Sequence, residues 1–333
     1  MSEAKVLVIG AGAWGTALAA VFARAGTQTY LWDADAALME QLQSSRRHPR
    51  LCPEIEFPDK LRPLAELTSE IDVDCAMFVV PFQVLRAAYR GLRASGASYS
   101  ALACASKGFE LDTLAVAHEI IAEESDEQLP FAQVSGPNFA AEVMRDAPAA
   151  ITVGASDTEF GQALVSAMHG EMFRPYLTDD VVGVEIGGAL KNVIAIAAGI
   201  VDGLQLGSNT RAALITRGLA EMARLGVARG ARAETFMGLS GMGDLVLTCT
   251  DDQSRNRRFG LALARYGDID RAASEVGALV EGVATARALA RNGHLDDIAL
   301  PIAREVAAVI DGNRDPRDVI KTLLEREIRF ERE

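Results

Sequence analysis

Short runs of aliphatic and β-branched residues alternate with stretches of helical periodicity through the first half of the chain. Short runs of this kind predict strands, and the stretches between them predict helices. Strands that alternate with helices predict a parallel, doubly wound sheet of the α/β class. We expect strands at residues 5–9, 27–32, 74–80, 100–106, 131–135 and 149–154, and helices that include residues 17–25, 84–92 and 114–123.

Helical periodicity dominates from about residue 179 onward, where the strand signals fade. Neither an internal repeat nor a low-complexity linker interrupts this half. We therefore expect an all-helical C-terminal domain, with no flexible spacer before it. The expected helices cover residues 181–202, 209–228, 257–266, 283–292, 302–311 and 316–324, with turns at 291–294 and 311–316.

A glycine motif follows the first strand. Gly10-x-Gly12-x-x-Gly15 lies between that strand and an alanine-rich helix, and Asp33 ends the next strand. In this βαβ context the motif predicts a dinucleotide-binding, Rossmann-type domain. The first two glycines permit the turn and the approach of a pyrophosphate, and the third lets helix pack on strand. We assign residues 1–180 to this domain and residues 181–333 to a helical substrate-binding and catalytic domain.

The residues around Asp33 bear on the choice of cofactor. Asp33 could accept hydrogen bonds from the adenosine ribose, which favours NAD over NADP. Ala34 and Asp35 offer no cation for a 2′-phosphate, whereas Arg46 and Arg47 are near in sequence and could supply one. The sequence leaves both cofactors open.

Composition narrows the class of protein. A hydrophobic fraction of 49% with 24% charged residues is typical of a globular protein. The N-terminus lacks the pattern of a signal peptide, and residues 193–201, the purest apolar run, are far fewer than the roughly 20 that span a bilayer. We expect a soluble, cytoplasmic protein without membrane insertion.

Charge and metal-binding residue types exclude further classes. A net charge of −13 disfavours nucleic acid and anionic membranes as partners. Any small anionic ligand must therefore meet a local cluster of positive charge. The four cysteines form no CxxC pair and the four histidines form no HExxH pair, so we expect neither a disulfide framework nor a metal site.

Lys107 is the first candidate for chemistry. It belongs to the segment SKGF, which directly follows a predicted strand, as SGPNFA follows another. Ligands of doubly wound sheets lie beyond the carboxyl ends of the strands. Lys107 is thus expected where cofactor and substrate meet, although an exposed loop lysine would look the same.

Lys191 and Asn192 lie inside the apolar run GGALKNVIAIAAGI, at residues 187–200. No residue three or four positions from Lys191 is acidic, so another segment or a ligand must balance its charge. Asp244, in the turn GMGDL, is the best candidate, although turn chemistry alone could place an aspartate there. Burial would lower the pKa of this lysine and Asp244 would oppose that shift. A purely structural lysine remains an alternative.

A basic segment at residues 241–260 is the other candidate. Ser254 is a good N-cap, and a capped helix N-terminus beside an arginine is a natural phosphate site. The alternative is a solvated surface whose charges Asp251 and Asp252 balance. The arginines of this segment are Arg255, Arg257 and Arg258.

Several motifs occur in one order along nearly the whole chain. They are GAGAWGTALA, SKGF, SGPNFA, GGALKNVIAIAAGI, TRGLAEMARLG, GDLVLTCTDDQSRNRRFG and VEGV. With them the chain closely resembles the soluble, bacterial-type NAD(P)-dependent glycerol-3-phosphate dehydrogenases. The resemblance implies reversible reduction of dihydroxyacetone phosphate to sn-glycerol 3-phosphate by NADH or NADPH, for glycerophospholipid synthesis. It also implies a homodimer.

The resemblance implies roles for individual residues. Lys191 becomes the catalytic acid/base and Lys107 a substrate ligand beside the nicotinamide. We add Asp244, which opposes the pKa shift of Lys191, and Asn192, which would polarise or orient the substrate oxygen, to the catalytic set. The implied substrate positions are Lys107, Gly136, Asn138, Lys191, Asp244, Thr248, Ser254, Arg255 and Asn256. The implied cofactor positions are Gly10, Gly12, Ala13, Trp14, Gly15, Asp33, Ala34, Lys107, Ala140, Arg255, Leu279 and Glu281.

Three positions depart from this family's pattern. Ala13 stands where serine is usual, and Phe82 where a small residue is frequent. Asp33 and Ala34 lack the basic or histidine side chain often found there, which keeps the cofactor choice open.

Two other functions fit the residues. One is a two-domain dehydrogenase of a β-hydroxy acid or sugar acid, which needs a carboxylate clamp instead of a phosphate clamp. The other is a dinucleotide sensor that kept the fold and lost the chemistry, against which Lys107, Lys191 and Asp244 argue together.

Overall fold

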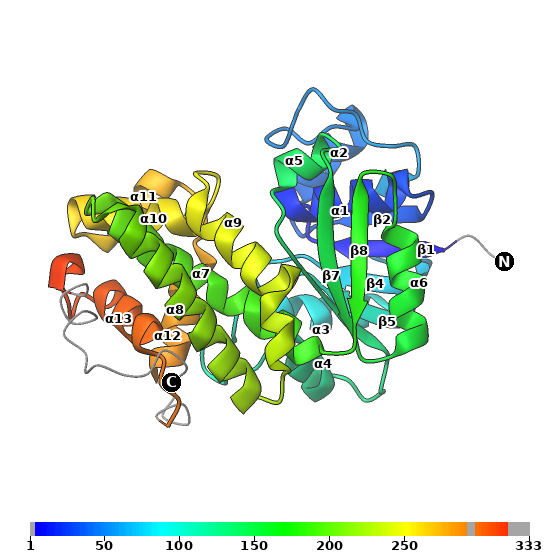
Figure 1. Cartoon of the computed structure of the whole chain (residues 1–333). Helices are drawn as coiled ribbons and strands as arrows, with labels where there is room; N and C mark the ends of the chain where they lie inside the picture. Colours follow the sequence, from blue (N-terminus) through cyan, green and yellow to red (C-terminus); the bar gives the residue numbers. More distant parts are fainter. Residues whose placement is uncertain (1–3, 292–296, 319–333) are drawn as a thin grey trace.

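The computed structural model describes residues 4–291 and 297–318, and Figure 1 shows a sheet with its helices beside a bundle of helices. The sheet has eight strands in the order β3-β2-β1-β4-β5-β6-β7-β8. The strands are β1 (Lys5–Ile9), β2 (Gln28–Trp32), β3 (Leu61–Pro63), β4 (Asp72–Phe78), β5 (Ser98–Cys104), β6 (Phe131–Ser135), β7 (Ala149–Ala155) and β8 (Phe173–Thr178).

All six predicted strands are present, but the parallel arrangement is incomplete. β7 runs antiparallel to β6, whereas the other neighbouring pairs are parallel. The reversal arises because the chain between them forms only the short helix α5 (Ala140–Met144) and does not cross to the other end of the sheet. The segment between β6 and β7 therefore stays at the carboxyl end of β6, which is the edge where ligands bind in such sheets.

Two strands were not predicted from the sequence. β3 is only three residues long and ends in Pro63, and β8 contains Pro175 within the polar-interrupted run FRPYLT. Both lie at the edges of the sheet, where proline is tolerated because no ladder hydrogen bond is lost. The weak sequence signal of both strands follows from their edge positions.

The faces of the sheet bury alternate residues of each strand. In β1, Val6 and Val8 pack into one core with α1 (Ala13–Arg24) and α6 (Thr158–Met168). Leu7 and Ile9 pack into a second core with α3 (Leu85–Ser95) and α4 (Ala117–Glu124). Burial on both faces explains why β1 reads as a continuous apolar run. α2 (Ala36–Ser45) completes this part of the chain.

The remaining helices surround α7 (Val181–Gly203), which packs against α8 (Gly207–Ala228), α9 (Asp244–Thr250), α10 (Arg255–Tyr266) and α12 (Glu281–Arg291). α11 (Ile269–Val276) and α13 (Pro301–Ile310) complete the described bundle. α9 and α11 were not predicted. Parts of three predicted elements lie outside the described residues. They are the last residue of the helix at 283–292, the turn at 291–294 beyond its first residue, and the helix at 316–324 beyond residue 318.

Within the described ranges, α7 alone is long and apolar enough to cross a membrane, and its apolar window is entirely buried in the protein. It is thus the core helix of this bundle. Glycine makes the close packing possible: a Cβ on Gly199 would lie 2.1 Å from the Arg257 carbonyl oxygen of α10. Gly260 of α10 faces it, with the same approach to the Ile196 oxygen.

Candidate active site

The glycine motif forms the turn between β1 and α1. Gly10 has a φ of +110°, and a Cβ there would lie 2.5 Å from the Val79 oxygen. A Cβ on Gly15 would lie 1.8 Å from the Gly10 oxygen. A Cβ on Gly12, by contrast, would meet no protein atom within 4 Å. Folding therefore requires the first and third glycines, whereas the open space at Gly12 fits the close approach of a ligand.

The start of α1 beside Gly12 fits an anionic group. No side chain caps this helix, and Gly12 and Ala13 are exposed. The free N–H groups of a helix N-terminus attract phosphate. The residues present thus fit the pyrophosphate of a dinucleotide.

Asp33 is held in place at the end of β2. Its carboxylate accepts hydrogen bonds from the Ala11 N–H at 2.7 Å and from the Asp35 N–H at 3.0 Å. Arg46 and Arg47, the cations left open for a 2′-phosphate, are engaged elsewhere. Arg46 donates to the carbonyl oxygens of Leu61, Phe57 and Pro58, and Arg47 to those of Pro53 and Glu54 and to the Glu56 carboxylate.

The buried ammonium of Lys191 is balanced by Asp244. Lys191 Nζ lies 2.5 Å from Asp244 Oδ1 and 3.0 Å from Thr248 Oγ1. The other carboxylate oxygen of Asp244 lies 2.6 Å from Lys107 Nζ. Ser135 Oγ also approaches this oxygen, at 3.4 Å. Two lysines from distant segments thus share one buried carboxylate.

These contacts set the protonation of the group. Burial lowers the pKa of Lys191 to about 8, although Asp244 opposes the shift, and the charge of Lys107 adds to it. Burial acts to raise the pKa of Asp244, but the two lysines outweigh burial and lower it. At neutral pH Asp244 is therefore a carboxylate, and Lys191 is an ammonium within about one pH unit of losing its proton.

Glycines on α7 admit the partners of Lys191. A Cβ on Gly188 would lie 3.2 Å from Lys107 Cγ and 3.0 Å from Ser135 Oγ. A Cβ on Gly187 would lie 2.6 Å from the Ser240 oxygen, in the turn that precedes Asp244. The two glycines therefore let α7 receive the lysine of one segment and the aspartate of another.

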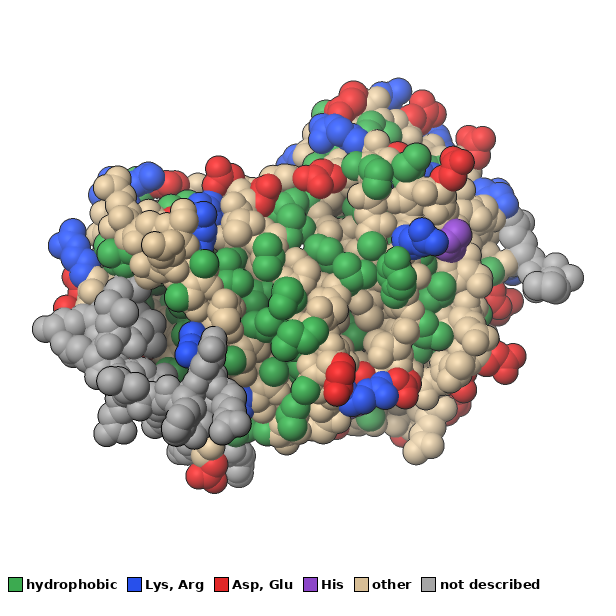
Figure 2. Space-filling view, viewed as in Figure 1, with side chains coloured by type: hydrophobic (Ala, Val, Ile, Leu, Met, Phe, Trp, Pro, Cys, Tyr) green, Lys and Arg blue, Asp and Glu red, His purple; other side chains and the backbone are tan. Residues whose placement is uncertain are grey.

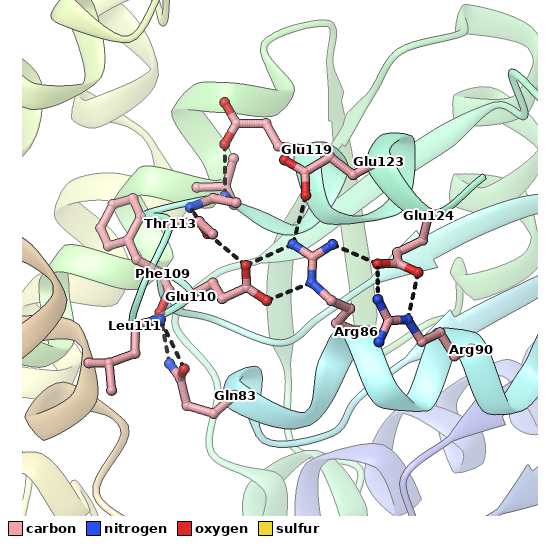
Figure 3. A network of polar contacts seen from close by, with 12 residues as sticks. Gln83, Arg86, Arg90, Phe109, Glu110, Leu111, Thr113, Glu119, Glu123 and Glu124 are labelled. Carbon is pink, nitrogen blue, oxygen red and sulfur yellow. Dashed lines mark hydrogen bonds and ion pairs between the residues drawn. The ribbon is translucent and has the colours of Figure 1, made fainter. Parts of the chain in front are cut away.

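The loop that carries Lys107 is fixed by polar contacts from neighbouring elements (Figure 3). On its way out of β5, Ser106 Oγ donates to the Val80 oxygen at 2.6 Å and the Ser106 oxygen accepts from Gln133 Nε2 at 2.9 Å. Further along, Gln83 Nε2 donates to the Phe109 oxygen at 2.7 Å. Lys107 thus lies between two anchored points.

Glu110 of the same loop is bound in a bidentate ion pair by Arg86 of α3, at 2.8 and 2.7 Å. Arg86 also contacts Glu123 and Glu124 of α4, at 2.7 and 2.8 Å. One guanidinium therefore joins the loop to two helices, and the bidentate geometry fixes its direction.

A chain of amides orients Asn192. The Gly282 N–H donates to Asn256 Oδ1 at 3.0 Å, and Asn256 Nδ2 donates to Asn192 Oδ1 at 2.9 Å. The backbone N–H at one end sets the direction of both amides. The N–H donors of Asn192 therefore point away from Asn256.

The arginines of the basic segment at residues 241–260 are of two kinds: one is paired inside the fold and two are exposed to solvent. Ser254 caps α10 by accepting a hydrogen bond from the Arg257 N–H, as predicted. Arg257 is buried and pairs with Asp202 at 2.6 Å and also with Asp252, so its charge is used within the fold. Arg255 and Arg258 are exposed. The alternative of a solvated surface therefore holds for part of the segment only.

Glu281, the first residue of α12, lies near Arg255, the first residue of α10. Glu281 Oε1 accepts from the Phe82 N–H at 3.4 Å. Burial raises the pKa of Glu281, while that N–H and the Arg255 charge oppose the rise. Phe82, one of the three departures from the family pattern, thus meets α12 through its backbone.

The other sequence-predicted positions lie as follows. Gly136 has a φ of +157° and stands against Ile151 of β7, which leaves no room for a Cβ. Asn138 Nδ2 donates to the Ala150 oxygen at 2.9 Å, while its Oδ1 is buried without a partner. Trp14 and Ala140 are partly buried, and Ala34 and Leu279 are exposed.

Sequence reasoning missed several residues of this site. Ser106 and Ser135 stand inside SKGF and SGPNFA, so the motifs contained a signal that was not used. Arg86 and Glu110 are 24 residues apart, and no spacing rule connects them. Across residues 4–291 and 297–318, no group of three or more histidine, cysteine, aspartate or glutamate side chains is placed to hold a metal ion.

Comparison with known proteins identifies relatives over nearly the whole chain. Residues 5–161 match the N-terminal family described as NAD-dependent glycerol-3-phosphate dehydrogenase N-terminus. Residues 180–321 match the corresponding C-terminus.

Individual relatives agree with the family match. The chain is 47% identical to glycerol-3-phosphate dehydrogenase [NAD(P)+] of Stenotrophomonas maltophilia, over 97% of this chain and 95% of that protein. It is similar to the crystal structure of glycerol-3-phosphate dehydrogenase from Coxiella burnetii, with a TM-score of 0.92 and 38% identity over 97% and 99% of the two chains. A D-mandelate dehydrogenase with NADH, at 14% identity and a TM-score of 0.64 over 95% of this chain and 99% of that one, shares the fold alone.

Proposed function

Because the chain belongs to the NAD-dependent glycerol-3-phosphate dehydrogenase family, we propose that Lys191 is its acid/base. The protein is an NAD(P)-dependent glycerol-3-phosphate dehydrogenase, an oxidoreductase that interconverts dihydroxyacetone phosphate and sn-glycerol 3-phosphate. The observation that carries the proposal is the buried group in which Lys191 and Lys107 share Asp244, at 2.5 and 2.6 Å.

Lys191 has the properties of a proton donor for this reaction. With a pKa of about 8, lowered by burial, its ammonium gives up a proton near neutral pH more readily than an exposed lysine. The proton passes from Lys191 Nζ to the C2 oxygen of dihydroxyacetone phosphate as C2 is reduced. When bound, the nicotinamide supplies the hydride to C2. In the reverse reaction the free amine of Lys191 accepts the proton.

The neighbours of Lys191 position the substrate. Lys107 and the N–H donors of Asn192 polarise the C2 oxygen. Asp244 holds the two lysines in place and keeps Lys191 charged. Thr248 is a second hydrogen-bond partner of Lys191, at 3.0 Å.

The substrate phosphate needs positive charge on an acidic protein. We assign it to the exposed Arg255, to Asn256 and to the start of α10 behind Ser254. Gly136 and Asn138 are assigned to the same substrate pocket. Binding of the phosphate orients a small molecule for reaction.

For the cofactor we propose a preference for NAD over NADP. Asp33 is held as an acceptor for the ribose hydroxyls, and it would repel a 2′-phosphate. The guanidinium groups of Arg46 and Arg47 donate to loop carbonyls, which takes them away from that role. The remaining cofactor positions, Gly10, Gly12, Ala13, Trp14, Gly15, Ala34, Lys107, Ala140, Arg255, Leu279 and Glu281, are proposed as the family resemblance implies.

We further propose a cytoplasmic homodimer that supplies glycerophospholipid synthesis. Large apolar side chains are exposed on β8 (Tyr176, Leu177) and before and in α9 (Met237, Met242, Val246). Figure 2 shows hydrophobic side chains over the middle of the face on which Figure 1 shows β7, β8 and α9. The net charge of −13 argues against nucleic acid as a partner.

We divide the chain into a cofactor domain at residues 1–180 and a helical substrate domain at residues 181–333. In support, the sheet ends with β8 at Thr178 and α7 begins at Val181. The two family matches also meet between residues 161 and 180.

One experiment tests the function directly. Purified protein is mixed with dihydroxyacetone phosphate, and oxidation of NADH and NADPH is followed separately at matched concentrations. We expect turnover with both cofactors and a higher kcat/KM with NADH. Dihydroxyacetone without phosphate should react far more slowly. Faster reaction with a keto acid than with dihydroxyacetone phosphate would contradict the substrate assignment, and cofactor binding without any turnover would indicate a sensor.

A further inference from the structure

His48 is a buried histidine that none of the roles above uses. It lies in the loop after α2 and is only 3% exposed. Its Nε2 stands 3.2 Å from the carbonyl oxygen of Ala11. Ala11 is the residue between Gly10 and Gly12 in the turn assigned to the cofactor, so His48 contacts the backbone of that turn.

The hydrogen bonds of His48 fix its tautomer. Its Nδ1 accepts the Arg50 N–H at 3.1 Å and the Leu51 N–H at 2.9 Å. A ring nitrogen that accepts hydrogen bonds carries no proton. The single proton of the neutral ring is therefore on Nε2, which donates to the Ala11 oxygen.

This donor controls the direction of a neighbouring N–H. The Ala11 carbonyl and the Gly12 N–H belong to one planar trans peptide, so they point in opposite directions. His48 and Thr16 Oγ1, which donates at 3.2 Å, both hold the Ala11 oxygen toward the protein. The Gly12 N–H therefore points away from His48 and Thr16, at a residue whose Cβ would meet no protein atom within 4 Å.

We propose that His48 is a positioning residue for the dinucleotide: as the neutral Nε2–H tautomer it orients the Ala11–Gly12 peptide toward the cofactor phosphate, and its protonation weakens cofactor binding. A second ring proton would be placed on Nδ1, opposite the two N–H groups of Arg50 and Leu51. That repulsion opens the 48–51 turn and removes the support from Ala11. The proposal rests on the assignment of the glycine turn to the cofactor.

The charges around His48 agree with a neutral ring. Burial lowers its pKa from the ordinary 6.5, the contact with Ala11 opposes the shift, and the Arg50 charge adds to it. On the far side of Ala11, Asp33 is engaged by the Ala11 N–H. Beyond the loop, Arg145 of the α5 end pairs with Glu54, and the Cys52 thiol contacts the Ala141 oxygen. No carboxylate contacts the ring itself among the described residues.

The sign of the pH effect follows from the lowered pKa. The folded protein holds His48 neutral, whereas the unfolded chain protonates it below pH 6.5. The contribution of His48 to stability is thus complete above pH 6.5, whereas the cofactor affinity falls only as the pH falls through the lowered pKa of the folded protein. The stability contribution is lost as the pH falls from 6.5 through the lowered pKa of the folded state.

The test measures NAD⁺ binding by calorimetry from about pH 8 to about pH 5, because NAD⁺ survives acid. His48→Asn keeps an oxygen acceptor for the 48–51 turn, but its side chain is too short to reach Ala11. His48→Gln is long enough to donate to Ala11 and cannot be protonated. Both variants keep Glu281 and the other titrating groups, so differences from wild type report on His48.

We expect His48→Asn to bind NAD⁺ roughly threefold to tenfold more weakly than wild type at the upper end of this range, the loss typical of one hydrogen bond. We expect His48→Gln to bind nearly as well as wild type there and to keep its affinity in acid, where wild type loses it. Thermal unfolding at about pH 8 checks that both variants are folded, and the KM for dihydroxyacetone phosphate at saturating NADH serves as a control that should change little.

Wild-type affinity and pH dependence in His48→Asn would overturn the proposal. So would an acid loss in His48→Gln as large as in wild type, because the titrating group would then lie elsewhere. Absence of NAD⁺ binding by the wild-type protein would overturn the cofactor assignment, and this proposal with it, whereas binding without turnover would leave the proposal standing and contradict only the proposed reaction.

Discussion

At the scale of single residues, one buried carboxylate decides the chemistry of the site. Asp244 is shared by Lys191 and Lys107, so neither ammonium is fully neutralised. Burial lowers the pKa of Lys191 to about 8, against the opposing charge of Asp244. A lysine that titrates near neutral pH can serve as acid in one direction and as base in the other.

The two directions of the reaction should therefore respond oppositely to pH. Reduction of dihydroxyacetone phosphate needs the Lys191 ammonium, so its kcat/KM should fall as the pH rises through about 8. Oxidation of glycerol 3-phosphate needs the amine and should rise through the same pH. Lys191→Met should lower kcat by roughly 10²–10⁴ with little change in the Kd of NADH. Steady-state rates over pH in both directions check this, and parallel profiles would contradict it.

Asp33 should determine the choice between cofactors. Asp33→Asn keeps an acceptor for the Ala11 N–H but removes the charge that opposes a 2′-phosphate. We expect the ratio of kcat/KM for NADH to that for NADPH to fall roughly tenfold or more, since like charges at short range cost this much. Asp35→Asn, a matched control two residues away that preserves the α2 cap, should leave the ratio unchanged. The proposal fails if both variants keep the wild-type ratio.

At the scale of elements, the loop after β5 depends on α3 and α4 for its shape. The bidentate pair of Arg86 with Glu110 is about four-fifths buried on both sides. It is thus shielded better than a surface ion pair, which contributes little. The loop carries Lys107 at one end of this anchored region.

Removal of Arg86 should loosen that loop. We expect Arg86→Met to lower kcat/KM for dihydroxyacetone phosphate several-fold, up to about tenfold, while NADH binding changes less. Arg93→Met is the matched control, because Arg93 lies on the same helix but pairs with Asp126 outside the loop. Faster hydrogen exchange at residues 107–115 in the first variant only would support the interpretation, and equal kinetics in the two variants would refute it.

At the scale of the whole molecule, Asp244 also joins the two halves of the chain. It pairs a loop of the sheet region, through Lys107, with the bundle helix that carries Lys191. Asp244→Asn would leave two lysine charges without a counter-charge in a buried place.

We expect Asp244→Asn to lower the free energy of unfolding by about 3–5 kcal/mol, as when one partner of a buried pair is removed. Urea unfolding checks the value, with Asp59→Asn, an exposed aspartate, as the neutral control. The deficit should shrink as the pH rises above 8, where the Lys191 amine is already uncharged. A loss below about 1 kcal/mol would show that the junction does not rely on this carboxylate.

The sequence predicted this architecture where a local pattern carried the information. α7 and β1 were found within a residue of their bounds because buried periodicity defines them. β3 and β8 were missed because edge strands with proline lack that periodicity. The strand β7 was predicted, but its antiparallel direction was not. The direction of a strand depends on the path of the connection before it, and the residue pattern of the strand does not contain that path.

The candidate site was predictable to a similar degree. The position of Lys191 in an apolar run indicated that its charge needs a partner, and Asp244 is that partner. The sharing with Lys107, the Arg86 pair and the tautomer of His48 depend on contacts between distant segments. The spacing of residues along the sequence does not predict these contacts.

Gly12 has a consequence for how variants of this enzyme would be selected. The fold does not require glycine at this position, because the methyl group of an alanine there would contact no protein atom within 4 Å. A library screened for stability would therefore accept alanine at this position, while a library screened for growth that depends on the enzyme's own activity would reject it. Under the proposed assignment, Gly12 serves the cofactor and is not required for folding.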